Sequence, residues 1–94
     1  MDQNRLLARR VGEVLHYTWD PIGVSDQPYA RDEYDGYIPE AMRLALGNHR
    51  DALIAYLYRT AAHTIGMAVS HEKCEEVADL ILAWVECVAD QRPY

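Results

Sequence analysis

The sequence predicts an all-α fold, a compact four-helix bundle with one ordered loop between helices one and two. Apolar residues recur every three or four positions in each apolar segment, and no segment alternates apolar and polar residues long enough for a strand. Half of the 94 residues are hydrophobic, which suffices for one core, so we expect a single domain over residues 1–94. Short connections between the helices favour antiparallel neighbours.

The first helix is expected to run from about Gln3 to Tyr17. Its apolar positions recur at helical spacing, so they form one stripe that faces the core. The members of this stripe are Leu7, Val11, Val14, Leu15 and Thr18.

Residues 19–28 form the substantial loop of the predicted fold. The loop begins Trp19-Asp20-Pro21-Ile22-Gly23-Val24. An aspartate can accept hydrogen bonds from backbone N–H groups just after it, so Asp20 is expected to fix the turn. Pro21 sets its own φ, and Gly23 permits a positive φ. With Trp19, Ile22 and Val24 buried as anchors, the loop is expected to be structural, and a recognition role for the same loop is the alternative.

A second helical region is expected from near Tyr29 to Gly47, with Pro28 suited to its first turn. Pro39 lies inside this region and has no N–H group to donate to the carbonyl of Asp35, so a kink or short break is expected there. The residues expected to face inward are Tyr34, Ile38, Met42, Ala45 and Leu46, while Tyr37 lies nearer the surface.

Asn48 is expected to cap the third helix, with Asp51 in its first turn, and Gly66 is placed to end it. The inward face of this helix consists of Leu53, Ile54, Leu57, Ala61 and Ile65.

The connector Met67-Ala68-Val69 is expected to pack over the core, and Ser70 then caps the fourth helix. This helix has the clearest amphipathic pattern of the chain. Its apolar positions are Cys74, Val77, Ala78, Ile81, Trp84, Val85 and Val88.

Cysteine use and the lack of export signals predict a cytoplasmic protein. Cys74 and Cys87 fall in one helix about 20 Å apart, too far for a disulfide, and reduced thiols are typical of the cytoplasm. Arg5, Arg9 and Arg10 interrupt the apolar residues near the start, which disfavours a secretory signal. No apolar run is long enough to span a membrane.

The negative charge is concentrated in two segments. Residues 20–40 hold six acids against Arg31, and residues 71–90 hold six acids against Lys73, so each segment carries −5 while the whole chain carries −6. Nucleic-acid binding needs clustered lysine and arginine, so this pattern argues against it. A partner protein with a basic surface is favoured instead.

The acids of these segments are the candidate partner-binding residues, together with one tyrosine, because tyrosine offers a large contact area at a small entropic cost. These candidates are Asp32, Glu33, Asp35, Tyr37, Glu75, Glu76, Asp79 and Glu86. For the acids of the fourth helix two plainer interpretations compete, solvation alone or neutralisation by Arg5, Arg9 and Arg10 of the first helix.

No catalytic, cofactor or metal motif is found. A calcium loop starting at Asp32 fails, because its alternate positions would be Tyr34 and Gly36. The histidines lack zinc spacing, and there is no glycine-rich phosphate loop. We therefore predict a protein that is not an enzyme and that holds no cofactor or metal.

Two pairs of residues in the sequence give weaker indications of catalysis. His16 and Asp20, four residues apart, could form a general-base dyad, but no nucleophile lies nearby in the sequence. Cys74 follows His71 by three residues at a helix start, a position that activates thiols. It also lies on the apolar stripe among acids, so packing is the expected role.

The motifs Trp19-Asp20-Pro21-Ile22-Gly23-Val24 and Asp32-Glu33-Tyr34-Asp35-Gly36-Tyr37-Ile38 resemble those of a family of small uncharacterised bacterial all-helical proteins, a domain of unknown function. The family pattern is a D-P-I-G loop followed about a dozen residues later by D-E-Y-D-x-Y. The resemblance extends from the first helix through Tyr56-Leu57 to the Gly66-Met67 turn. It implies a small helical cytoplasmic bacterial protein, and it supplies no catalytic residues.

The function expected from these patterns is a non-enzymatic interaction module with an acidic binding surface, such as an immunity or regulatory protein. Immunity partners of bacterial toxins enter here only by analogy. The alternative is a small ligand-binding or enzymatic bundle with a pocket under the D-P-I-G loop. A deep cleft lined by His16, Asp20 and Tyr34 would favour the alternative, and a flat acidic face would favour the interaction module. The sequence leaves the oligomeric state and the partner open.

Overall fold

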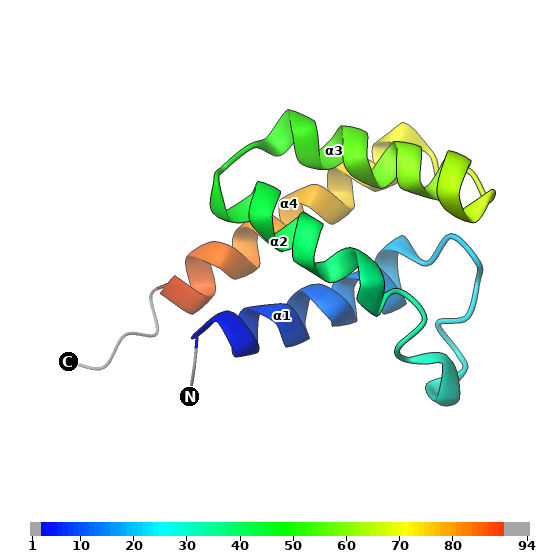
Figure 1. Cartoon of the computed structure of the whole chain (residues 1–94), viewed down its shortest axis with the longest axis horizontal. Helices are drawn as coiled ribbons and strands as arrows, with labels where there is room; N and C mark the ends of the chain where they lie inside the picture. The colour runs from blue at the N-terminus through cyan, green and yellow to red at the C-terminus, as the bar shows by residue number, and fades with distance from the viewer. Residues whose placement is uncertain (1–2, 90–94) are drawn as a thin grey trace.

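The computed structural model describes residues 3–89, and within this range it contains helices and turns but no strand. The principal helices are α1 (Gln3–Val14), α2 (Ile38–Leu46), α3 (Arg50–Arg59) and α4 (His71–Ala89). They pack against each other as one body, with the segment that joins α1 to α2 projecting at one end (Figure 1). The predicted all-α, four-helix fold is confirmed. None of these helices is both long enough and apolar enough to cross a membrane.

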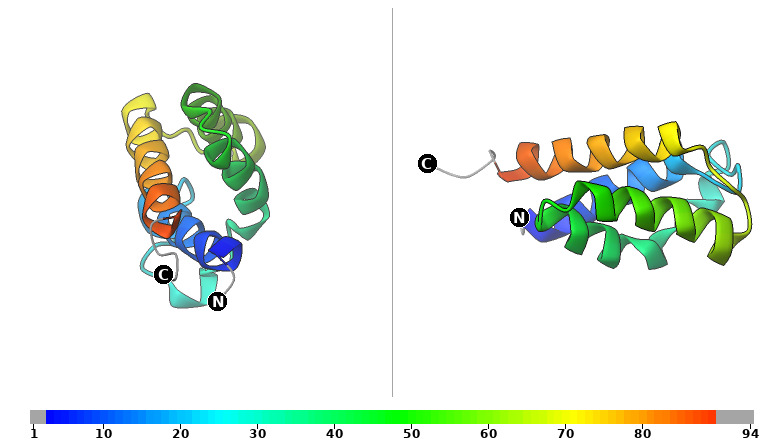
Figure 2. Two further views of the ribbon diagram at one scale, coloured as in Figure 1. Left: turned by 90° about the vertical axis from the view of Figure 1, so that its left-hand side faces the viewer. Right: turned by 90° about the horizontal axis from the view of Figure 1, so that it is seen from above.

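The four helices surround a common core. α4 packs against α1 and α3, and α2 packs against the same two helices, so these contacts close a ring of four helices (Figure 2). α2 also contacts α4 across the centre. Buried apolar side chains come from every helix, among them Val11, Leu44, Leu53, Leu57 and Ile81.

α1 continues into a wide π-helical turn, Leu15–Trp19, so the helical segment starts as predicted but extends two residues beyond the predicted end at Tyr17, and its winding changes. Leu7, Val11, Val14 and Leu15 are buried as expected. Thr18 is only half-buried, so its assignment to the inward stripe is corrected. A π-helical turn contains more residues than an α-helical turn. The next inward position therefore falls on Trp19, which is buried.

The segment between residues 28 and 37 is not a continuous helix. It contains two short 3-10 turns, Pro28–Ala30 and Asp35–Tyr37, and α2 starts only at Ile38. The helix start near Tyr29 is therefore wrong, and the kink or break expected at Pro39 is not found, because the turn Asp35–Tyr37 runs directly into α2 and the break lies at residues 31–34. Proline is tolerated in the first helical turn, where its missing N–H group costs nothing, and Pro39 occupies that turn.

α2 ends at Gly47 as predicted, but Leu46 is exposed, which contradicts its inward assignment. The buried positions of α2 are Ala41, Leu44 and Ala45. Each helical residue is rotated by about 100° from the one before. Leu46 therefore lies beyond the edge of this narrow stripe.

The turn between α2 and α3 uses Asn48 in a role other than the predicted cap. Asn48 adopts a left-handed conformation with φ 58°, which asparagine tolerates better than most residues. The residue preceding α3 is His49, whose side chain makes no capping hydrogen bond. The prediction for Asn48 is therefore wrong, because the tight turn requires the left-handed residue at this position.

α3 presents the predicted face, with Leu53, Ile54 and Leu57 buried. A second π-helical segment, Thr60–Ile65, extends it to Gly66, which ends it with φ 85°. Ala61 is buried in this extension, and Ile65 is half-buried against the core.

The connector after Gly66 covers the core less than predicted. Met67 and Ala68 are exposed, and only Val69 packs against the core. The N–H groups of Gly66 and Met67 both donate to the carbonyl of Ala61. The chain is thus held against the end of the helix there, and Met67 does not reach the core.

The fourth helix begins and packs as predicted. The Ser70 hydroxyl accepts a hydrogen bond from the Lys73 N–H at 3.1 Å, which is an N-cap. Cys74, Val77, Ala78, Ile81 and Val88 are buried, while Trp84 and Val85 are half-buried against the core.

The two cysteines are expected to differ in reactivity. Cys74 is buried, and burial raises the pKa of its thiol, whereas Cys87 is exposed. A thiol must ionise and be reached by the reagent before it reacts. We expect an aromatic disulfide reagent at pH 8 to modify one thiol per native chain, and a second only after unfolding. The Cys87→Ser variant should show no rapid phase; a rapid phase in that variant would contradict the assignment.

Candidate functional site

The D-P-I-G loop is organised by the side chain of Asp20. This residue ends the π-helical turn in a left-handed conformation, with φ 36°. Its carboxylate accepts hydrogen bonds from three successive backbone N–H groups, those of Gly23 at 3.0 Å, Val24 at 2.8 Å and Ser25 at 2.9 Å. The predicted role of Asp20 as the acceptor that fixes the turn is confirmed.

Tyr34 joins the two sequence motifs into one structural unit. Its ring is buried, with 2% of the side chain exposed. Its hydroxyl donates to Asp20 Oδ1 at 2.8 Å and accepts from the Ile22 N–H at 2.9 Å. Trp19 meets the rings of Tyr34 and Tyr37 edge-on, at centroid distances of 5.4 and 5.9 Å. The predicted orientation, Tyr34 inward and Tyr37 nearer the surface, is confirmed.

These contacts shift the ionisation of both polar groups. Burial would raise the pKa of Asp20, but the hydrogen bonds from Val24, Tyr34 and Ser25 outweigh it and lower that pKa. Burial and the neighbouring Asp20 carboxylate raise the pKa of Tyr34 well above its ordinary value. The stable combination is therefore a charged carboxylate and a neutral phenol.

One anchor predicted for the loop is not buried. Ile22 has 40% of its surface exposed, although its N–H group is held by Tyr34. Val24 is half-buried and packs against the core. The core beneath the loop is filled by the rings of Trp19 and Tyr34, so the small turn leaves Ile22 outside.

His16 and Asp20 do not form the dyad that their spacing allows. His16 is 1% exposed, and neither ring nitrogen has a hydrogen-bond partner among the described residues. Trp19 Nε1 is likewise buried without one. Because Asp20 is hydrogen-bonded to the loop backbone and to Tyr34, His16 and Asp20 do not form a general-base dyad.

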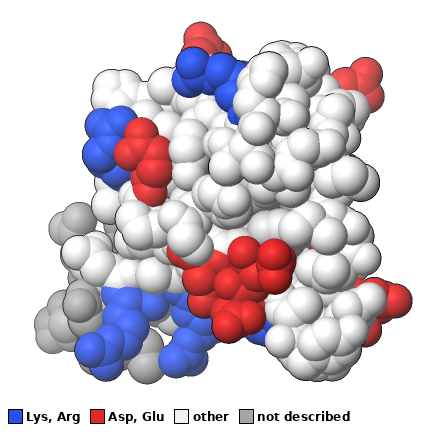
Figure 3. All heavy atoms as spheres, turned by 45° about the vertical axis from the view of Figure 1, so that its right-hand side comes forward, with Lys and Arg blue, Asp and Glu red and all other residues white. Residues whose placement is uncertain are grey.

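The residues after the loop form an exposed acidic surface, which we define as Asp32, Glu33 and Asp35. All three are exposed, and none forms an ion pair with another residue in the range 3–89. Successive turns order the backbone here, with the Asp35 N–H donating to the Asp32 carbonyl at 3.1 Å. Acidic side chains gather in one patch on the face drawn in Figure 3, with basic side chains directly beside it.

The candidate acids of α4 are mostly engaged within the chain. Asp79 receives two hydrogen bonds from Arg50, at 2.8 and 3.2 Å, and these lower the pKa of Asp79. Glu75 lies 3.1 Å from His71, and Glu76 lies 3.4 Å from Lys73. Among the predicted acids of α4, Glu86 has no such contact with a described residue.

The arginines of α1 do not neutralise the acids of α4. The interpretation of the sequence that expected this neutralisation is therefore wrong. Arg10 pairs with Glu13 of its own helix at 2.6 Å, and its guanidinium lies 5.3 Å from the centre of the Trp84 ring. The contact between α1 and α4 at this point is therefore cation–π rather than an ion pair.

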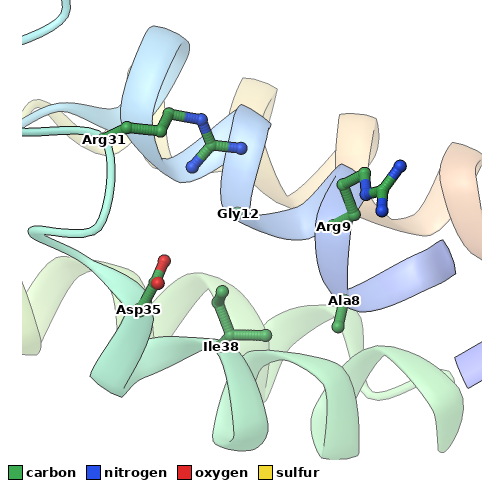
Figure 4. A pocket seen from close by; sticks show the side chains of 6 residues that line it. All are labelled: Ala8, Arg9, Gly12, Arg31, Asp35 and Ile38. Atoms are coloured by element: carbon green, nitrogen blue, oxygen red, sulfur yellow. The ribbon is translucent and has the colours of Figure 1, made fainter. Parts of the chain in front are cut away.

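A hollow of about 290 Å³ lies between α1 and the segment that leads into α2 (Figure 4). Its lining residues are Ala8, Arg9, Gly12, Arg31, Asp35 and Ile38. It does not include His16, Asp20 or Tyr34, the residues expected for a pocket under the D-P-I-G loop. The sequence pattern does not predict this hollow, although it contains one signal: Gly12, a glycine inside a helix, indicates close approach of another group.

Within residues 3–89, no three His, Cys, Asp or Glu side chains come together in a way that could hold a metal ion. Comparison of the chain with protein-family models, with curated proteins and with solved structures finds no match.

Proposed function

We propose that this protein is a non-enzymatic interaction module that presents the acidic surface Asp32, Glu33 and Asp35 to a basic partner protein. An immunity or regulatory protein of the bacterial cytoplasm, related to the small helical family that its motifs resemble, is the setting we favour. The observation that carries the proposal is the combination of exposure, order and unpaired charge at these three residues. Charge of one sign in a compact area accelerates encounter with an oppositely charged partner.

The residues beneath this acidic surface hold it in one conformation, which favours recognition of a partner. Tyr34 lies within the acidic motif and is buried, and its hydroxyl is fixed between Asp20 and the Ile22 N–H group. A surface held in advance loses little entropy on binding. Tyr37, half-buried against Trp19, adds an aromatic edge beside the acids. The acids of α4 become a secondary candidate, because Glu75, Glu76 and Asp79 already have partners.

The alternative, a ligand-binding or enzymatic bundle with its pocket under the loop, has less support. Its central residues, Asp20 and Tyr34, hydrogen-bond to each other and to the loop backbone. A substrate would have to displace these bonds before it reached either group.

Reversal of the acidic surface to lysine, Asp32→Lys with Glu33→Lys and Asp35→Lys, is expected to weaken partner binding by at least about tenfold at low salt. The loss should shrink as salt is raised, because ions screen exposed charges. Affinity is measured by titration calorimetry against a partner recovered from the native host, after circular dichroism has shown that the variant is folded.

A matched variant reverses three acids of α4, Glu75→Lys, Glu76→Lys and Glu86→Lys. It changes the net charge equally and should reduce affinity much less. An equal loss of affinity in both variants would indicate a general effect of net charge. Unchanged affinity in both variants would show that the acids are only solvated and do not bind the partner. Either outcome contradicts the proposal.

A further inference from the structure

The hollow between α1 and the residues before α2 contains two arginines whose charges are not matched within the protein. Arg9 and Arg31 line it, and neither forms an ion pair with any residue between 3 and 89. Other arginines of the same chain do pair: Arg10 with Glu13, Arg43 with Glu40, and Arg50 with Asp79. Asp35 lines the same hollow and is still not within ion-pair distance of either guanidinium.

Gly12 makes the floor of this hollow. A methyl group built at Gly12 would lie 3.1 Å from Ile38 Cδ1 and 3.5 Å from Arg31 Nη1. The missing side chain therefore lets the Arg31 guanidinium lie against the backbone of α1, where Figure 4 shows it pointing toward Gly12. The guanidinium is also 5.8 Å from the centre of the Tyr17 ring, which helps to hold it there.

We propose that this hollow binds a small oxyanion, a carboxylate or a phosphate, through Arg9 and Arg31. Guanidinium groups present N–H donors in a planar fork that matches both kinds of oxyanion. Two arginines and one aspartate give the site a net charge of +1, which favours a monoanion. Asp35 adds an acceptor for a hydroxyl or ammonium group of the ligand.

The size and lining of the hollow limit the ligand. Its volume of about 290 Å³ lies at the lower end of ligand pockets, so it fits a small molecule. Ala8 and Ile38 lie on the same side of it and offer an apolar wall for a short aliphatic part (Figure 4). This site does not depend on the proposed partner, because an anion needs only the two arginines.

The test titrates the full-length ¹⁵N-labelled protein with sodium phosphate and, separately, with sodium acetate at constant ionic strength. We expect saturable shifts of the Arg9 and Arg31 Nε–Hε signals and of the Gly12 amide with at least one probe. The probe that binds more tightly identifies the chemical source of the oxyanion. Shifts that do not saturate with either probe, or that spread evenly over all arginines, overturn the proposal.

Four variants locate the binding. Arg9→Gln and Arg31→Gln should each weaken the affinity for the better probe by at least about fivefold, whereas Arg5→Gln, one helical turn before Arg9, should leave it unchanged. Gly12→Ala keeps both charges and fills the floor, so it should also weaken binding. Equal weakening by Arg5→Gln would indicate diffuse attraction, and full affinity in Gly12→Ala would put the anion outside the hollow. Both results contradict the assignment.

Discussion

Replacement of Asp20 by alanine is expected to lower the free energy of unfolding by about 2–3 kcal/mol. The carboxylate accepts from three backbone N–H groups and from the Tyr34 hydroxyl, and alanine leaves all four donors without it. Alanine also tolerates the left-handed conformation of this position poorly, with φ at 36°. Urea denaturation followed by tryptophan fluorescence measures the loss.

The Asp20→Asn variant is the matched control. Asparagine tolerates the left-handed conformation and keeps one acceptor oxygen, so its loss should be smaller, about 1 kcal/mol. An Asp20→Ala variant as stable as the parent would show that the loop serves recognition rather than the fold. Affinity for the partner would then be the property that the substitution changes.

The loss of stability at acid pH provides a second test of the role of Asp20. Because its pKa is lower in the folded protein than in the unfolded chain, the charged form contributes stability above the unfolded value of about 4. That contribution disappears as the pH falls through the lower, folded value. The parent should therefore lose more stability than Asp20→Asn between pH 5 and acid pH, and parallel curves would contradict the shift.

Replacement of His16 by leucine is expected to raise the free energy of unfolding by about 1–2 kcal/mol. Both ring nitrogens are buried without a partner among the described residues, which leaves their lost hydration uncompensated. Leucine has a similar volume and no polar atom. The edge-on contact with Tyr17, at a centroid distance of 4.5 Å, would be lost and reduces the gain.

The comparison variant is His63→Leu at an exposed position, where a surface substitution should change stability by less than about 0.5 kcal/mol. Thermal and urea denaturation at pH 8 give both values. If His16→Leu is less stable than the parent, the ring nitrogens have partners in solution, and His16 contributes to the fold rather than burdening it.

Much of the fold could be predicted from the sequence, because apolar spacing directly reports which helical faces are buried. Leu53, Ile54 and Leu57 on α3, and Cys74, Val77 and Ile81 on α4, lie where a repeat of 3.6 residues puts them. The same rule put Thr18 on the inward stripe, since it assumes constant winding, whereas the burial of Trp19 was expected from its place at the start of the loop and is confirmed. Hydrophobicity alone also could not show that Leu46 lies outside the stripe of α2.

Local chemistry was predictable at Asp20 and Tyr34, where a short-range hydrogen-bonding preference and a helical face sufficed. The hollow was not predictable, because Arg9 and Arg31 are 22 positions apart in the sequence and line one hollow only in the folded chain. Asp79 of α4 shows the same limit. Its pairing with Arg50 follows from the packing of α3 on α4, which no local pattern encodes.

The wide turn Leu15–Trp19 also bears on how this protein tolerates changes of length. Deletion of one residue there would let the helix regain ordinary winding, but Trp19 and Asp20 would be rotated by about 100° about the helix axis, so Trp19 would leave the core and the Asp20 carboxylate would no longer meet the Tyr34 hydroxyl. By contrast, the exposed turn between Val24 and Tyr29 has no side chain in the core. Among related sequences, we therefore expect insertions and deletions in that turn and a fixed number of residues between Val14 and Ser25.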